Sequence, residues 1–225
     1  MNDAFIVAIV GAESTGKTRL ARELSDALSL RTGLRSTWVP EALREWCDAR
    51  GRTPRADEQA AIAAEQHARI DAAAFVHEIV VADTTALMTA VYSRLLFGDE
   101  SLRAYAVQQQ RRCALTLLTA LDLPWQADGL QRDGPHVRAP VDALVRQWLI
   151  EHELEWSVVG GTGPQRTQAA LDAVAPRLRA RGTPGRGLFT RLAERNAAPL
   201  ARPWFCETCD SPECEHALLQ QRLSG

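Results

Sequence analysis

Residues 11–18 read Gly-Ala-Glu-Ser-Thr-Gly-Lys-Thr, which fits the pattern G-x-x-x-x-G-K-[ST] at every position. The apolar run Ala4–Val10 precedes this stretch and predicts a buried strand, and the amphipathic segment from Thr18 to about Leu30 predicts a helix after it. In this context the pattern predicts a phosphate-binding loop rather than a chance glycine turn. Its two glycines let backbone N–H groups turn inward, and the helix N-terminus adds partial positive charge where a phosphate would sit.

The loop also supplies the side chains that bind a nucleoside triphosphate and its metal ion. Lys17 is the only lysine in the chain, beside 25 arginines. A compact ammonium fits among phosphate oxygens where a planar guanidinium would collide, so we expect Lys17 to reach the outer phosphates of ATP. The Thr18 hydroxyl is expected to bind Mg²⁺. The residues predicted to contact the nucleotide here are Gly11, Glu13, Ser14, Thr15, Gly16, Lys17 and Thr18.

Composition limits the classes of protein to consider. The 225 residues suffice for one α/β domain with an ample core, and the formal net charge of −2 gives no basic field for nucleic acid or an anionic membrane. The apolar run near the N-terminus is too short for a membrane span and lacks the basic lead of a signal peptide. Five cysteines, an odd number, indicate a reducing compartment, so we expect a cytoplasmic protein. The oligomeric state stays open.

Strand and helix patterns alternate along the chain. Further strands are predicted at residues 36–39, 78–83, 114–118 and 155–159, and helices at 42–50, 56–77, 87–96, 101–111, 140–153 and 164–180. This alternation predicts an α/β fold with a five-stranded parallel sheet and helices on both faces. Ligands of such sheets bind at the carboxyl ends of the strands. Residues 121–139 form a connection too long for a simple loop, which is typical of an active-site lid.

Two acidic residues follow predicted strands at the expected ligand-binding edge. Asp83 ends the third strand, where it could hold Mg²⁺ or cap the next helix. Glu41 follows the second strand, where it could accept the proton of a substrate hydroxyl, hold a sugar hydroxyl, or again cap a helix. Arg44 lies one helical turn after Glu41 and could contact substrate or only pair with that carboxylate.

Other candidate site residues lie in the lid, on the long third helix and after the last strand. Arg132 and Arg138 would suit charge stabilisation on a transferring phosphoryl group. Trp125 and Asp128 in the lid, with Gln66 on the helix, are candidates for contact with substrate, although Trp125 could equally anchor the lid. Gly161 and Thr162 belong to a glycine-rich turn that we expect to border the adenine ring.

The C-terminal part has a different character. We predict a phosphate-loop domain over residues 1–181 that includes the lid at 121–139, a linker with a short helix over 182–203, and a cysteine-rich tail over 204–225. The soft ligands of the tail are Cys206, Cys209, Cys214 and His216. Their composition suits a closed tetrahedral zinc site, and a reduced tail without metal is the alternative that stays open.

Residues from about 4 to 175 resemble the ribosylnicotinamide kinase domain of the NadR family, which is also grouped with AAA-type small ATP-binding proteins. The matching motifs are Gly11–Thr18, Pro40-Glu41 with Arg44, His67–Asp71, Ala82–Thr84 and, most specifically, Leu123-Pro-Trp-Gln-Ala-Asp-Gly-Leu130 at the start of the lid. The resemblance implies a phosphate-loop kinase that transfers the γ-phosphoryl group of ATP to the ribose 5′-hydroxyl of nicotinamide riboside, with Mg²⁺ as cofactor.

The sequence departs from that family at two positions near the expected nucleoside pocket. Pro40 stands where the family has an aromatic residue, and Thr85 stands where it has a second acid. No part matches the adenylyltransferase or DNA-binding domain of longer members, so those activities are not expected. The alternatives are a kinase of another nucleoside or metabolite, and a regulatory ATPase that binds a partner through its tail.

Overall fold

The computed structural model describes residues 4–126 and 134–181, and within them five parallel strands form one sheet. The strands lie in the order β2-β3-β1-β4-β5. Their bounds are β1 (Phe5–Val10), β2 (Ser36–Val39), β3 (Ile79–Asp83), β4 (Leu115–Thr119) and β5 (Trp156–Val159). The predicted five-stranded parallel sheet is therefore confirmed, with strand ends that differ from the prediction by one residue at most.

Burial of the strands follows their place in the sheet. Every residue of β1, β3 and β4 is buried, because helices cover both faces of these central strands. The edge strands β2 and β5 are mostly half-buried, and each ends on a buried valine. Continuous apolar runs such as Phe5–Val10 are therefore explained by the parallel sheet, in which neither face of a central strand meets water.

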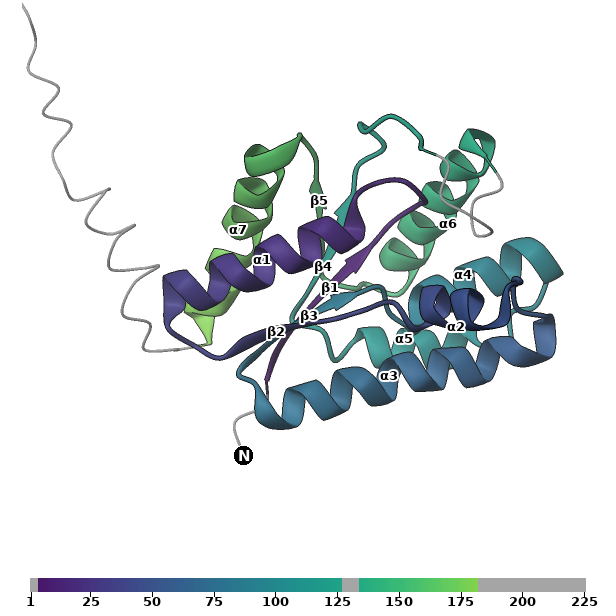
Figure 1. Ribbon diagram of the computed structural model, residues 1–225, viewed down its shortest axis with the longest axis horizontal. Helices are drawn as coiled ribbons and strands as arrows, with labels where there is room; N and C mark the ends of the chain where they lie inside the picture. Colours follow the sequence, from purple (N-terminus) through teal and green to yellow (C-terminus); the bar gives the residue numbers. More distant parts are fainter. Residues whose placement is uncertain (1–3, 127–133, 182–225) are drawn as a thin grey trace, which may run out of the picture. The chain divides into compact units, whose positions relative to one another are not determined.

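The helices form one layer on each face of the sheet (Figure 1). Helices α1 (Lys17–Thr32) and α7 (Gly163–Ala180) pack against each other on one face. The other face carries α3 (Gln59–Val76), α4 (Ala86–Phe97), α5 (Arg103–Gln110) and α6 (Arg138–Glu151). The remaining elements are α2 (Ala42–Arg50), which packs on α3, and the short 3₁₀ helices η1 (Ala56–Glu58) and η3 (Pro135–Val137).

Three predicted helix starts differ from the structure by two or more residues, and one of them is α5, which begins at Arg103 rather than at 101. The helix predicted from residue 56 begins as the 3₁₀ turn η1 and becomes α-helical at Gln59. Helix α6 begins at Arg138 rather than at 140, so Pro140 lies in its first turn. The first turn of a helix tolerates proline because its N–H groups have no partner within the helix. Arg138 is therefore a helix residue and not a lid residue.

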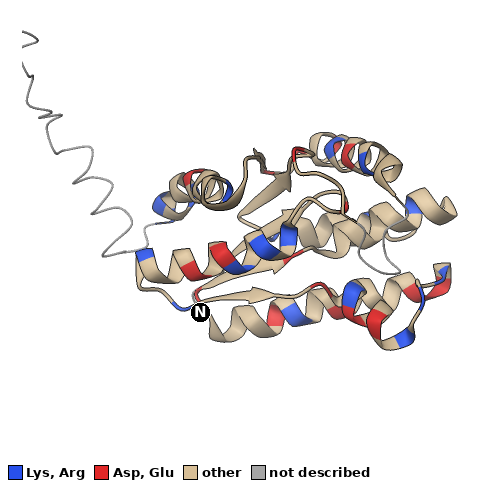
Figure 2. Ribbon diagram, turned by 45° about the horizontal axis from the view of Figure 1, so that its top comes forward, with Lys and Arg blue, Asp and Glu red and all other residues tan. Residues whose placement is uncertain are grey.

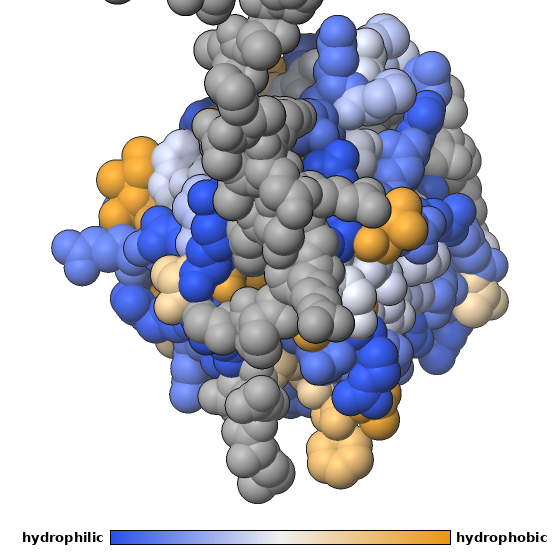
Figure 3. All heavy atoms as spheres, turned by 90° about the vertical axis from the view of Figure 1, so that its left-hand side faces the viewer, coloured by the Kyte–Doolittle hydropathy of each residue, from blue (hydrophilic) through white to orange (hydrophobic). Residues whose placement is uncertain are grey.

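Charged residues of both signs are distributed along the helices, whereas the strands contain almost none of them (Figure 2). On the face drawn in Figure 3, apolar residues form separate spots among polar ones. No helix among the described residues is long and apolar enough to cross a membrane. All of these elements belong to one compact unit. The predicted linker and tail lie outside the described residues.

Candidate active site

The stretch Gly11–Thr18 connects β1 to α1 and has the backbone of a phosphate-binding loop. Gly11, Ser14 and Gly16 have φ values of 143°, 57° and 76°. A Cβ atom on Gly11 would lie 2.2 Å from the Thr119 hydroxyl oxygen at the end of β4, so no larger side chain fits there. Gly16 occupies the N-cap of α1 in the left-handed region, which glycine adopts without strain. Glycine is therefore required at both motif positions, at Gly11 by close packing and at Gly16 by the backbone conformation.

The hydroxyl groups of two buried threonines, Thr15 and Thr119, stabilise the loop by hydrogen bonds. The Thr15 hydroxyl donates to the Ala12 carbonyl at 2.8 Å and lies 2.7 Å from the Thr119 hydroxyl, and Thr119 in turn donates to the Val10 carbonyl at 3.2 Å. Thr15 has no exposed surface. Its predicted contact with a nucleotide is therefore left to its backbone N–H, while its hydroxyl shapes the loop. Thr119 was not predicted, because nothing in its own strand marks it as part of the loop.

A buried arginine from α7 also reaches the loop. The Arg166 guanidinium donates to the Thr15 carbonyl at 2.9 Å, to the Gly161 carbonyl at 2.8 Å and to a carboxylate oxygen of Asp122 at 2.8 Å. The other Asp122 oxygen accepts the Gly161 N–H at 2.5 Å. Arg166 is 5% exposed. This network joins the phosphate loop to the ends of β4 and β5, and the sequence alone did not single out Arg166 or Asp122.

The lone lysine lies at the mouth of the loop. The half-buried Lys17 ammonium donates to the Ala12 carbonyl at 2.9 Å. Burial lowers its pKa, and the nearby carboxylates of Glu41 and Asp83 oppose this shift. An ammonium that has already lost most of its water and faces two carboxylates is placed to exchange those contacts for phosphate oxygens.

Asp83 lies beside the loop at the carboxyl end of β3, in register with Ile9 of β1. The carboxylate is 1% exposed, and burial raises its pKa, against a hydrogen bond from Thr18 and the charge of Lys17. Its Oδ1 atom has no hydrogen-bond partner among the described residues. Because an orphaned buried carboxylate oxygen next to a hydroxyl is a suitable donor set for Mg²⁺, Asp83 and Thr18 fit the predicted metal site.

The alternative role of Asp83 as a helix cap is wrong. Thr85 is the N-cap of α4, and its hydroxyl accepts the Leu87 N–H at 3.3 Å. The same hydroxyl donates to the Gln110 side-chain oxygen at 2.6 Å. Thr85 is therefore fully engaged in helix capping on the sheet side of α4.

Glu41 lies at the N-cap of α2, but its side chain makes no capping hydrogen bond. The Glu41 carboxylate lies 3.8 Å from the Arg44 guanidinium, and the two side chains are 11% and 35% exposed. Both side chains line the same large cavity as Lys17. The structure thus brings Glu41 and Arg44 together with the phosphate loop, as their positions after β2 predicted.

This cavity has a volume of about 610 Å³ and extends from the phosphate loop to an apolar wall. The wall comes from α2, the segment before η1, α4 and the start of α6; its apolar members include Leu43, Cys47, Pro54, Tyr92, Leu95, Leu96, Val137, Pro140 and Val141. Burial raises the pKa of the Cys47 thiol to about 11, so this thiol stays neutral. Ligand cavities of proteins commonly have this size and mixture of apolar walls with few polar groups.

Several predicted site residues do not line this cavity. Gln66 is 2% exposed, and its amide is engaged with backbone groups of residues 40, 42 and 84. Trp125 is half-buried outside the cavity, and its Nε1 has no hydrogen-bond partner among the described residues. Gly161 and Thr162 lie at the end of β5 near Arg166, so their expected place beside adenine stays a prediction.

Arg138 also differs from its predicted place. The side chain is 8% exposed, and its guanidinium donates to the Leu123 carbonyl at 2.9 Å. It fastens the start of α6 to the start of the predicted lid, and contact with a phosphoryl group stays a prediction. A second link joins this segment to the loop: the Ser14 hydroxyl donates to the Gln126 carbonyl at 2.9 Å and accepts its N–H at 2.8 Å.

Some predictions fall on residues that the structure does not describe. These residues are Asp128, Arg132, Cys206, Cys209, Cys214 and His216. Within residues 4–126 and 134–181, no three His, Cys, Asp or Glu side chains gather as a metal cluster would require. Zinc binding by the tail therefore stays a prediction from sequence.

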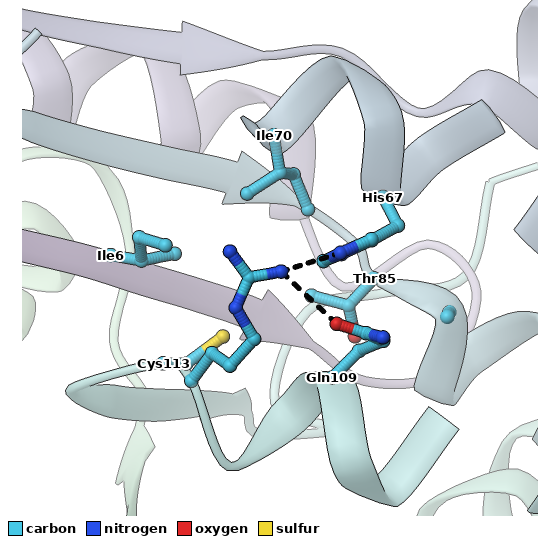
Figure 4. A pocket seen from close by; sticks show the side chains of 8 residues that line it. Ile6, His67, Ile70, Thr85, Gln109 and Cys113 are labelled. Atoms are coloured by element: carbon cyan, nitrogen blue, oxygen red, sulfur yellow. Dashed lines mark hydrogen bonds between the residues drawn. The ribbon is translucent and has the colours of Figure 1, made fainter. Parts of the chain in front are cut away.

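A second hollow, of about 10 Å³, is lined by residues that include His67, Thr85, Gln109 and Cys113 (Figure 4). It has room for one water molecule at most. Arg112 closes it by hydrogen bonds to His67 at 2.5 Å and to Asp71 at 2.6 Å. Although His67 is next to Gln66 in sequence, its side chain belongs to a polar cluster with Arg112 and Asp71. His67 does not line the large cavity.

Comparison with known proteins agrees with this geometry. Residues 6–166 match the family described as AAA domain, and no curated protein matches the sequence. A NadR protein in complex with NR superposes with a TM-score of 0.62 at 20% identity, covering 77% of this chain and 50% of that chain. A NadR protein in complex with NAD and AMP-PNP gives 0.59 at 21% identity, with 77% and 49% covered.

A thymidylate kinase from Ehrlichia chaffeensis gives a TM-score of 0.51 at 12% identity, covering 77% of this chain and 98% of that chain. The chain spans about half the length of the NadR chains that it matches. These likenesses confirm the predicted NadR-like fold. The chain therefore belongs to the AAA domain family and has the fold of the phosphate-loop kinases.

Proposed function

We propose that the protein is an ATP-dependent kinase that transfers the γ-phosphoryl group of ATP to the 5′-hydroxyl of nicotinamide riboside, forming nicotinamide mononucleotide and ADP. The observation that carries this proposal is that one cavity of about 610 Å³ joins the phosphate loop to the Glu41 carboxylate and an apolar wall. Phosphoryl transfer requires a phosphate cradle and an acceptor hydroxyl within one water-excluding space.

The donor side would hold ATP through the loop. Backbone N–H groups of Gly11–Thr18 and the N-terminus of α1 would donate to the phosphate oxygens. Lys17 would exchange its contact with the Ala12 carbonyl for the β- and γ-phosphates. Thr18 and Asp83 would hold Mg²⁺, which when bound neutralises charge that develops on the phosphate oxygens.

The acceptor side would present the hydroxyl. Glu41 lies close enough to Lys17 for their charges to interact, so a hydroxyl bound to its carboxylate lies near the phosphates. The carboxylate would orient this hydroxyl and accept its proton as the new P–O bond forms. Arg44, 3.8 Å from Glu41, would fix the carboxylate by its charge. Positioning and electrostatics would supply most of the catalysis, because phosphoryl transfer asks little covalent chemistry of the protein.

The choice of nicotinamide riboside rests on the resemblance of the lid motif, residues 123–130, to the NadR family and on the fold of NadR proteins that bind NR and AMP-PNP. Pro40 and Thr85, which depart from the family, lie at the ends of β2 and β3. A kinase of another nucleoside is the second candidate, supported by the similar fold of a thymidylate kinase.

The test is product formation from a panel of nucleosides with ATP and Mg²⁺, analysed by mass spectrometry. The panel contains nicotinamide riboside, adenosine, cytidine, uridine and thymidine, and the Lys17→Arg protein serves as the inactive control. We expect nicotinamide mononucleotide to form fastest. Faster phosphorylation of another nucleoside would identify that nucleoside as the acceptor. If none of the five nucleosides is phosphorylated, the proposed nucleoside kinase activity is overturned.

A further inference from the structure

Helix α3 carries two buried glutamines whose surroundings differ. Gln59 and Gln66 are seven residues apart, which is two helical turns, so they lie on the same face of the helix. Each is 2% exposed. Residue type, element and burial are thus matched, and the two amides differ in what they bind.

The Gln66 amide is satisfied by the backbone. Its oxygen accepts the Ala42 N–H at 2.6 Å, and its nitrogen lies 3.3 Å from the Pro40 carbonyl and 3.4 Å from the Thr84 carbonyl. These contacts join the segments that follow β2 and β3, which carry Glu41 and Asp83. Both the oxygen and the nitrogen of the Gln66 amide are therefore engaged by the backbone, and Gln66 is a positioning residue.

The side-chain oxygen of Gln59, by contrast, has no hydrogen-bond partner among the described residues. This Oε1 atom is buried, and Gln59 is one of the residues that line the 610 Å³ cavity. A buried amide oxygen without a partner costs free energy, and nearly all such groups in native proteins are paired. The missing partner is therefore expected in a molecule that fills the cavity.

The position of Gln59 indicates which part of the acceptor it would meet. Helix α3 starts beyond the carboxyl ends of the strands and runs back along the sheet (Figure 1), so Gln59 lies about 10 Å along the helix axis from Gln66, toward the start of the helix. Gln66 touches the segments of Glu41 and Asp83, where the acceptor hydroxyl would react. In a nucleoside the ribose separates the 5′-hydroxyl from the base, so the base would reach toward the first turn of α3.

We infer that Gln59 selects the base of the acceptor nucleoside, by accepting a hydrogen bond from an N–H group on the edge of that base. The wall that it shares, with Leu43, Pro54 and Leu96, is apolar and would hold the ring without reading its polar edge. The substrate class is thus nucleosides whose base presents an N–H donor at its edge, on a carboxamide, an amino group or the ring itself. This inference rests on the proposed kinase function and adds the residue that determines specificity.

The experiment compares two substrates and two matched variants. The substrates are nicotinamide riboside and the pyridinium riboside that lacks the carboxamide, and the variants are Gln59→Met and Gln66→Met, which keep side-chain length and remove the amide. We measure kcat/KM for both substrates, their dissociation constants by calorimetry, and the melting temperature of each protein. If the nucleosides bind without turnover, the same comparison is made from the dissociation constants.

Gln59→Met should lower kcat/KM for nicotinamide riboside by roughly ten- to a hundredfold and change that for the pyridinium riboside by less than about threefold. Its melting temperature should not fall, since an unpaired polar group is removed. Gln66→Met should lower the melting temperature and reduce kcat/KM for both substrates by the same factor, because it leaves the Ala42 N–H unpaired.

An equal loss for both substrates in Gln59→Met, or no loss, would overturn the inference while leaving the kinase in place. A wild-type protein with a higher kcat/KM for the pyridinium riboside than for nicotinamide riboside would also overturn the inference and leave the kinase in place. A wild-type protein that neither binds nor phosphorylates any nucleoside would overturn the proposed function and, with it, this assignment.

Discussion

The two ends of the large cavity are built in different ways. At the phosphate end, one continuous stretch, Gly11–Thr18, supplies the cradle, and buried polar groups such as Thr119 and Arg166 hold its backbone in place. At the acceptor end, apolar side chains from α2, α4 and α6 form the wall, and few polar groups interrupt them. The backbone of the first end is held by hydrogen bonds within the protein, and Asp83 Oδ1 is left without a partner among the described residues where the metal ion is expected. At the second end Gln59 Oε1 has no partner among the described residues, in a wall that is otherwise mostly apolar.

This difference indicates what each end can tolerate. A cradle of backbone amides serves the same phosphates whatever the acceptor, so its geometry is constrained by sterics and hydrogen bonding. An apolar wall can change its shape through single side chains without loss of the fold. We therefore expect changes at the phosphate end to remove activity toward all acceptors and changes at the acceptor wall to alter selectivity.

The largest effect should follow from the lone lysine. Lys17→Arg keeps the charge and should fold normally, but turnover should fall by roughly a hundred- to a thousandfold, because a guanidinium cannot take the position of the ammonium among phosphate oxygens. Steady-state assays with ATP and nicotinamide riboside measure this loss. Arg35→Lys, an exposed arginine paired with Glu78, is the control and should retain full turnover. A Lys17→Arg protein with near wild-type turnover would refute the role of Lys17.

The carboxylate at the acceptor side should separate nucleotide binding from chemistry. Glu41→Gln should lower phosphorylation of the nucleoside by roughly a hundredfold and leave the affinity for an ATP analogue within about threefold of wild type. Glu45→Gln is the matched control, because Glu45 lies on the same helix, is half exposed and pairs with Arg69. An active Glu41→Gln together with an inactive Asp83→Asn would show that Asp83, and not Glu41, is the base.

The sequence predicted the phosphate end almost completely. The motif is local, so the strand before it, the helix after it and the roles of its glycines follow from one continuous stretch, Ala4 to about Leu30. The carboxyl ends of β2 and β3 were also placed correctly, because Glu41 and Asp83 each follow an apolar strand and all strands of a parallel sheet end at one edge.

The groups that support the loop and form the acceptor wall could not be predicted in the same way. Arg166 contacts Thr15 although the two residues are 151 positions apart in the sequence. No local sequence pattern distinguishes Arg166 from the other arginines among the 25. Gln59 and Gln66 look equivalent in the sequence, and only the structure shows that one amide is satisfied and the other is not. Side-chain partners over such separations depend on packing, which periodicity does not specify.

A third prediction tests whether sterics fix the phosphate end. In Gly11→Ala the new Cβ would lie 2.2 Å from the Thr119 hydroxyl oxygen, so unfolding free energy should fall by about 1–3 kcal/mol more than in the control. The control is Gly33→Ala, where φ is 73° but nothing lies within 4 Å, so that only left-handed strain of about 1 kcal/mol remains. Denaturant titration of both variants measures the difference, and equal losses would contradict the steric account.

The smallest effect concerns an ion pair beside the acceptor wall. A hydrogen bond from Arg52, with one from the Arg55 N–H, lowers the pKa of the half-buried Glu58 carboxyl from 4.5 to about 2. A lowered pKa in the folded state adds stability above pH 4.5, and this contribution is lost as the pH falls toward 2. The melting temperature of wild type should exceed that of Glu58→Gln slightly at pH 6, and the gap should close by about pH 2 to 3. A gap that is independent of pH would contradict this pairing.

The most direct test of the whole account asks whether the two ends of the cavity act together. ADP release by the wild-type protein is measured at saturating ATP and Mg²⁺, without nucleoside and then with nicotinamide riboside. A kinase that completes its site around the acceptor should release ADP roughly tenfold faster or more when the nucleoside is present, with one nicotinamide mononucleotide formed for each ADP. Equal ADP release with and without every nucleoside tried would contradict the kinase and leave an ATPase in its place.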